Sequence, residues 1–127
     1  MSLFGVGINK HKKELKKEVE NIDKDIRDIL ELLKEFRYPY DRDPKKIEKS
    51  IKLIEKILTE IKKHKESLHK LYGSKPDNFP ELKTVETYLN ICLNTLKAIE
   101  KRRDAAIHDS SLEMIEHYWQ KHRIKFK

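Results

Sequence analysis

Apolar residues recur over residues 10–36 in alternating steps of four and three, the heptad spacing of a helix that buries one face. This seam consists of Leu15, Val19, Ile22, Ile26, Ile29, Leu33 and Phe36. The next segment, 37-RYPYDRDP-44, ends the pattern because Pro39 and Pro44 cannot continue a helix. We therefore predict a first helix over about 10–36, preceded by an N-terminal arm over 1–9.

A second heptad pattern follows over residues 44–72. Asp43 and Pro44 make a good N-cap and first-turn pair, and Gly73 is a natural stop. The seam consists of Ile47, Ile51, Ile54, Leu58, Ile61, Lys65, Leu68 and Tyr72. Lys65 interrupts it, and Leu53 and Ile57 widen the apolar stripe. We predict a second long helix over these residues.

The third pattern begins near Pro80 and keeps its spacing to Ala106, which places Arg103 on an otherwise apolar stripe. Its members are Leu82, Val85, Leu89, Cys92, Leu96, Ile99, Arg103 and Ala106. Ser110 and Glu113 then fit a capping box, so a short fourth helix is expected over about 111–121. Leu112, Ile115 and Trp119 would face inward, with Tyr118 at the rim. The remainder, 122–127, would be a frayed basic tail.

These elements predict an all-α fold, an up-down helical bundle of three long helices and a short C-terminal fourth. Residues 10–121 would form its single domain. The first two helices could pair as an antiparallel hairpin or form a coiled coil between two chains. Pro39 and the connection over 73–80 favour folding back. Whether the third and fourth helices are one bent helix or two stays open.

Composition adds a partner class and a compartment. Charged residues make up 40% of the chain and the net charge is +7, which favours contact with a polyanion, although lysine-rich solvated faces also occur without such a role. The single cysteine, Cys92, lies among apolar neighbours and suits a core position in a reducing compartment. No apolar run has the length of a membrane span, and 1-MSLFGVGIN-9 is unlike a secretory signal. We expect a cytoplasmic protein without a membrane partner.

The stretch 101-KRRDAAIHDSS-111 is the main candidate for chemistry. A guanidinium in a packed core is costly unless it is paired, so Arg103 must have a partner, line a cleft, or lie where the seam opens to solvent. Ala105 and Ala106 would allow another element to approach closely. The structural alternatives are a salt-bridged arginine near a helix end and, for His108, a helix C-cap residue.

Arg103, Asp104 and His108 resemble the signature of the HEPN superfamily, in which an Arg precedes a His by four to six intervening residues and Asn, Asp or His often follows the Arg. The resemblance implies a helical bundle with the motif in its C-terminal part. It also implies a metal-independent endoribonuclease that works as a homodimer, in a toxin or antiphage-defence role. Toxin-type members often carry a Tyr two residues after the His, where this chain has Ser110.

The same resemblance implies roles for individual residues. His108 would move protons and Arg103 would stabilise charge on the phosphoryl oxygens, while Asp104 would hold one of these two or help in the dimer. Arg102 and Lys101 would contact RNA. Besides RNA and a second copy, the partners would include a cognate antitoxin or regulatory protein, and no cofactor is implied.

Two other interpretations compete with the nuclease. A metal site is disfavoured because His64 and His69, like His117 and His122, are five residues apart, a spacing that does not stack two ligands on one helical face. The alternative function is a non-catalytic bundle that binds nucleic acid or a protein partner, of an immunity or regulatory type.

Overall fold

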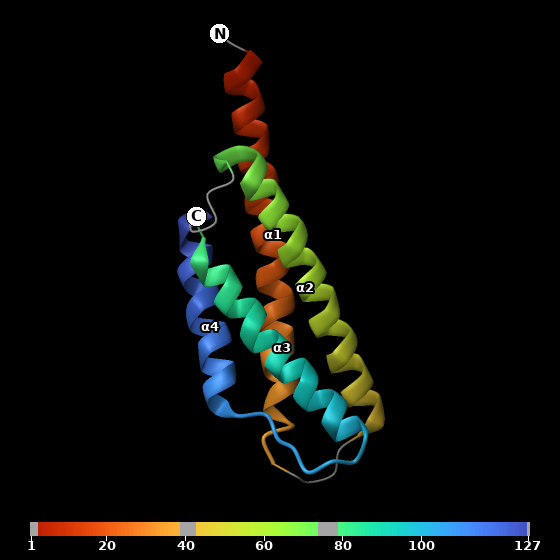
Figure 1. Cartoon of the computed structure of the whole chain (residues 1–127). Helices are drawn as coiled ribbons and strands as arrows, with labels where there is room; N and C mark the ends of the chain where they lie inside the picture. The colour runs from red at the N-terminus through yellow and green to blue at the C-terminus, as the bar shows by residue number, and fades with distance from the viewer. Residues whose placement is uncertain (1–2, 39–42, 74–78, 127) are drawn as a thin grey trace.

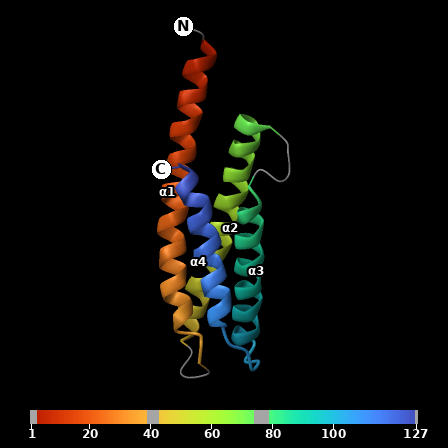
Figure 2. The same cartoon turned by 90° about the vertical axis from the view of Figure 1, so that its left-hand side faces the viewer.

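The computed structural model describes residues 3–38, 43–73 and 79–126, with side chains from residue 10 onward. Within these residues the chain forms four α-helices and a short 3-10 helix, and it contains no strand. They are α1 (Leu3–Lys34), α2 (Pro44–Tyr72), α3 (Pro80–Glu100), α4 (Asp109–Arg123) and η1 (Ile124–Phe126). Successive helices lie side by side and run in alternate directions (Figures 1 and 2). The predicted all-α up-down bundle is confirmed.

The α1–α2 hairpin also has the predicted form. All seven seam residues of the first helix, from Leu15 to Phe36, are buried in the core. Helices α1 and α2 pack against each other and run antiparallel within one chain (Figure 1). Asp43 caps α2 by accepting a hydrogen bond from the Lys45 backbone N–H at 2.9 Å, and Gly73 ends it with φ of 86°. Pro39, the other part of the predicted break, lies outside the described residues.

The two ends of the chain are more helical than predicted. Helix α1 begins at Leu3, so the arm expected over 1–9 is helical from residue 3, and its first turns project beyond the rest of the bundle (Figures 1 and 2). Residues 3–9 contain no proline, and each residue added to an existing helix gains a hydrogen bond without a new nucleation cost, which here outweighs the low helix propensity of Gly5 and Gly7. The frayed tail expected over 122–127 is also wrong for the described residues 122–126, because α4 continues through Arg123 and His122 is fully buried.

The predicted seam of α2 is wrong at alternate positions. Ile47, Ile54, Ile61 and Leu68 are buried as predicted. The alternate positions are not Ile51, Leu58 and Lys65 but the residues one position earlier, namely Ser50, Ile57 and His64. Both choices keep steps of three and four, so the pattern alone could not separate them. The consequence is that a histidine, and not a lysine, occupies the core.

Cys92 and Trp119 are buried and Tyr118 is partly exposed, as the pattern predicted. Over the described residues, no helix combines the length and the apolar character that crossing a membrane requires.

Candidate nucleic-acid interface at the connection between α3 and α4

Helix α3 ends six residues earlier than the heptad spacing predicted, at Glu100 instead of Ala106. The backbone N–H of Arg102 donates to the Ile99 carbonyl at 2.9 Å, and that of Arg103 donates to the Ala98 carbonyl at 2.9 Å. This pair of bonds is the Schellman motif, which satisfies the last carbonyls of a helix and turns the chain away from its axis. The buried seam of α3 therefore ends at Ile99, although the heptad spacing continues in the sequence to Arg103 and Ala106.

Arg102 occupies the left-handed position of this motif, with φ of 61°. Glycine is usual there, since a Cβ in this conformation costs about 1 to 2 kcal/mol. Among the described residues, Arg102 is the sole non-glycine residue with a positive φ. The sequence gives no sign of this strain because no glycine marks the turn.

Arg103 does not lie on a buried stripe, so that expectation is wrong. It is exposed, as are Lys101, Arg102, Asp104 and His108. Of the three possibilities for Arg103, the structure shows two together: the seam opens to solvent, and Arg103 borders a pocket. Among the described residues, no side-chain hydrogen bond or ion pair engages Arg103, Asp104 or His108. The expected contact of Asp104 with Arg103 or His108 is therefore not formed within the chain.

The connection is nevertheless anchored to the bundle. Ile107 is buried, and its backbone N–H donates to the Phe36 carbonyl at 2.9 Å. Ala105 is partly buried and packs against the core. Next to this anchor, Arg37 and Asp109 form an ion pair at 3.1 Å between the end of α1 and the start of α4. The exposed cations are thus carried by backbone that is held at both ends.

His108 is the N-cap residue of α4, with extended backbone and no side-chain capping bond. The predicted capping box at Ser110 is therefore wrong, and so is the alternative that His108 is a C-cap, because α4 begins at Asp109. Helices α3 and α4 are two separate helices joined by residues 101–108. The imidazole of His108 consequently lies at the positive end of the α4 dipole, which favours a nearby anion.

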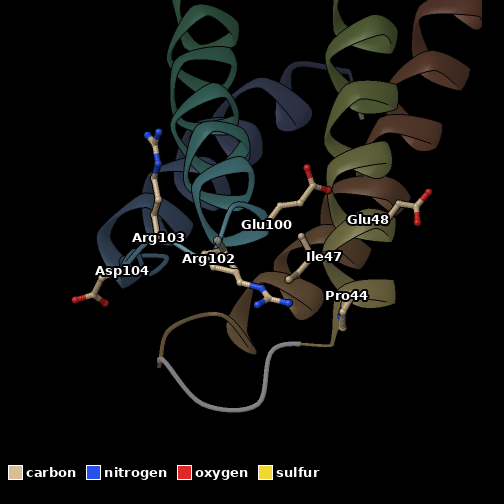
Figure 3. A pocket seen from close by; sticks show the side chains of 8 residues that line it. Pro44, Ile47, Glu48, Glu100, Arg102, Arg103 and Asp104 are labelled. Carbon is tan, nitrogen blue, oxygen red and sulfur yellow. The ribbon is translucent and has the colours of Figure 1, made fainter.

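A pocket of about 620 Å³ lies between the start of α2, the end of α3 and the connection. Figure 3 shows the Arg102 side chain reaching under α3 toward Pro44, while Arg103 and Asp104 point away from that gap. The pocket is lined by Pro44, Ile47, Glu48, Ile99, Glu100, Arg102, Arg103 and Asp104. The site therefore brings Arg102, Arg103 and Asp104 together at one pocket, and His108 is not among its lining residues.

The prediction missed a buried pair, His64 and His122, whose Nε2 atoms are 2.8 Å apart. The spacing argument considered only pairs of histidines on the same helix, whereas these two lie on α2 and α4. A signal was available: His122 lies three residues after Trp119 and continues the steps of Leu112, Ile115 and Trp119. His64 lies three residues after Ile61, on the alternative seam of α2.

The fold and these residues define a four-helix bundle with an exposed cationic connection between its last two helices. No family model matches the chain, and no curated protein or solved structure does either. In the part of the chain that the structure describes, no group of three or more His, Cys, Asp or Glu side chains is placed to hold a metal ion.

Proposed function

We propose that the protein is a HEPN-like, metal-independent endoribonuclease that acts as a homodimer through the connection between α3 and α4. The observation that carries this proposal is the conformation of Arg102. Backbone strain in a non-glycine residue persists where the surrounding structure imposes it, and it is concentrated at functional sites. Here it keeps a guanidinium at a turn where glycine would fit better, next to the exposed Arg103 and Lys101.

Three unpaired cations on consecutive residues suit a phosphate backbone. Lys101, Arg102 and Arg103 are all exposed, and the chain has a net charge of +7. Guanidinium groups donate hydrogen bonds to phosphate oxygens in a fixed planar geometry, whereas a lysine acts as a point charge. Arg102 and Arg103 would thus position the RNA strand and stabilise the charge that builds on the phosphoryl oxygens.

The reaction proposed is attack by the RNA 2′-oxygen on the adjacent phosphorus. The 2′-oxygen to phosphorus bond forms while the bond from phosphorus to the 5′-oxygen breaks, leaving a 2′,3′-cyclic phosphate and a 5′-hydroxyl. A base must take the 2′-hydroxyl proton and an acid must supply a proton to the leaving oxygen. Each connection carries one imidazole, His108, so two copies side by side would supply both groups.

The direct test is cleavage of single-stranded RNA in EDTA by the wild type and by His108→Ala. Loss of a general acid or base typically lowers the rate by about 10²- to 10⁴-fold. His117→Ala is the matched control, since His117 is also exposed but lies within α4, away from the connection. We expect 2′,3′-cyclic ends from the wild type and from His117→Ala, and almost no product from His108→Ala.

A second pair of variants tests the cation. Arg103→Ala should lower cleavage strongly, whereas Lys97→Ala, which removes an equal charge from the exposed face of α3, should not. The solution mass should be that of a dimer under assay conditions. Cleavage that is unchanged in His108→Ala, or a strictly monomeric active enzyme, would contradict the proposal.

One observation favours the alternative of binding without cleavage. Asp104 is not paired with His108, so no carboxylate within the described chain orients the imidazole. In that case the connection would hold a nucleic acid or a protein partner, such as an inhibitory antitoxin or regulator. RNA binding would then weaken as salt rises and would survive His108→Ala, with no product formed by either protein.

A further inference from the structure

A continuous chain of hydrogen bonds crosses the bundle near the C-terminal end of α4, which lies opposite the connection between α3 and α4 (Figure 1). Glu18 Oε1 lies 2.9 Å from His64 Nδ1, and His64 Nε2 lies 2.8 Å from His122 Nε2. His122 Nδ1 is 2.7 Å from Glu81 Oε1, which also accepts a hydrogen bond from Lys125 at 2.8 Å. This series of hydrogen bonds thus links all four helices and η1.

The two imidazoles are shielded from water. Both histidine side chains are 0% exposed. Aromatic rings surround His122, with ring centroids at 4.9 Å for Phe126, 5.5 Å for Phe79 and 5.6 Å for Trp119. Water cannot substitute for a missing donor in such a place, so the four ring nitrogens must be satisfied by one another and by the two carboxylates.

Counting protons shows what this arrangement requires. A carboxylate only accepts, so His64 Nδ1 and His122 Nδ1 must each carry a proton to donate to Glu18 and Glu81. The contact between the two Nε2 atoms needs one more proton, on either ring. Two neutral imidazoles carry two N–H groups, whereas the three contacts need three. Without the third proton, two lone pairs would face each other at 2.8 Å.

The surrounding charges fit a pair that holds one extra proton and not two. Although burial alone raises it, the hydrogen bonds from Lys125 and His122 bring the pKa of Glu81 below its usual range, which keeps Glu81 an acceptor. Burial, with repulsion from His64, lowers the pKa of His122 to about 4 against the hydrogen bond to Glu81. Burial likewise lowers the pKa of His64 against its bond to Glu18. Burial thus opposes a positive charge on either ring, and one extra proton is held because the three contacts require it and two carboxylates face the pair.

The charged groups bonded to the pair are Glu18 on α1 and Glu81 on α3, and Lys125 on η1 is bonded to Glu81. On α4, Arg123 is paired with Asp23. On α2, the neighbour Ser67 is uncharged and donates to Glu18 Oε2 at 2.8 Å. With one shared proton, the two negative charges of the carboxylates are balanced by the positive charges of the imidazole pair and Lys125. The hydrogen-bonded group of five side chains is then neutral overall.

We infer that His64 and His122 share a single extra proton at neutral pH, and that this proton holds the C-terminal end of α4 and η1 against α2 and α3. Loss of the proton at alkaline pH breaks one of the three contacts and loosens that end of the bundle. The pair is therefore a pH-sensitive clamp, independent of the proposed nuclease at the other end of the molecule.

Glu18→Gln provides a sharp test because it removes the need for the extra proton. An amide can donate, so the side-chain amide introduced at position 18 would donate to His64 Nδ1 while its oxygen still accepts from the Ser67 hydroxyl. His64 Nε2–H would then donate to His122 Nε2, and His122 Nδ1–H would donate to Glu81. All three contacts are made with two neutral rings. Glu20→Gln, which replaces an exposed residue of α1, is the matched control.

The first measurement is the nitrogen-15 spectrum of the labelled histidine rings of the whole protein at pH 7, which distinguishes protonated from unprotonated ring nitrogens. We expect three protonated nitrogens on the buried pair in the wild type and in Glu20→Gln, and two in Glu18→Gln. The second is urea unfolding from pH 7.5 to 9. The unfolding constant of the wild type should rise, by up to about tenfold per pH unit, until the pair releases its proton, while that of Glu18→Gln stays level.

Two outcomes would overturn the inference. One is a wild-type spectrum with only two protonated nitrogens on the buried pair at pH 7. The other is an alkaline dependence of the unfolding constant that is the same in the wild type and in Glu18→Gln.

Discussion

Replacing Arg102 with glycine should stabilise the fold while it weakens the proposed function. Arg102 has φ of 61°, and a side chain in the left-handed region costs about 1 to 2 kcal/mol. Glycine removes that cost but makes the unfolded chain more flexible, which returns about 0.4 to 1 kcal/mol. Because the Arg102 side chain is exposed, little packing is lost. The net expectation is a gain of about 1 kcal/mol in the free energy of unfolding, or roughly 4 °C in Tm.

The chain contains the controls for this experiment. Arg102→Ala removes the same guanidinium but keeps a Cβ, so the difference between the Ala and Gly variants isolates the backbone term. Gly73 ends α2 with φ of 86°, and a Cβ added there would meet no atom within 4 Å. Gly73→Ala should therefore cost about 1 kcal/mol through the backbone alone. Gly73 has ψ of −179°, so its strain differs in kind from that at Arg102, but both positions test a backbone conformation that disfavours a Cβ.

The assay is urea unfolding followed by Trp119 fluorescence, with RNA cleavage measured in parallel. Arg102→Gly and Arg102→Ala should lose cleavage equally, while only the glycine variant gains stability. Equal stability of these two variants would refute the left-handed turn. Full cleavage by Arg102→Gly would refute the use of the strained arginine in function.

Two further predictions concern buried groups. Burial, with the neighbouring Asp25 carboxyl, raises the pKa of Glu60 to about 7, so folded Glu60 keeps a proton that the unfolded chain releases. Its contribution to stability is therefore lost as pH rises from 4.5 to 7. The lowered pKa of His122 acts in the opposite direction, because its contribution to stability is lost as pH drops from 6.5 toward 4. In Glu60→Gln, the free energy of unfolding in urea should therefore fall at acid pH by up to about 1.4 kcal/mol per pH unit. A pH dependence of this free energy that is the same in the variant and the wild type would contradict both shifts. Burial also raises the pKa of Cys92 to about 12, so a thiol reagent at pH 8 should label it only as fast as the protein opens, and rapid labelling of the native state would show that Cys92 is not buried.

Most of the bundle could be predicted because heptad spacing is set by the geometry of packing. The seam of α1 is the clearest case, since each of its apolar residues from Leu15 to Phe36 is buried. In α2 the same rule allowed two registers, and nothing in the spacing separated His64 from Lys65. Periodicity fixes which face is buried only where the residue types on that face differ clearly from those beside it.

The end of α3 could not be predicted for a different reason. Spacing continued to Ala106, but a helix ends where its last carbonyls find other donors, and here the donors are the backbone N–H groups of Arg102 and Arg103. Such caps are usually recognised by glycine, which this turn lacks. Arg103, Asp104 and His108 were placed correctly near the junction of the last two helices, while the burial predicted for Arg103 was wrong.

The two polar features lie at opposite ends of the bundle and call for opposite interpretations of a variant. His108 and Arg103 are exposed and have no partners among the described residues, so their replacement removes nothing on which the fold depends. His64 and His122 each make two hydrogen bonds in the core, so removing either takes one hydrogen-bond partner from a carboxylate and one from the other imidazole. Loss of cleavage in His108→Ala with an unchanged unfolding free energy would therefore report on chemistry, whereas the same loss in His64→Ala would first have to be separated from a loss of folded protein.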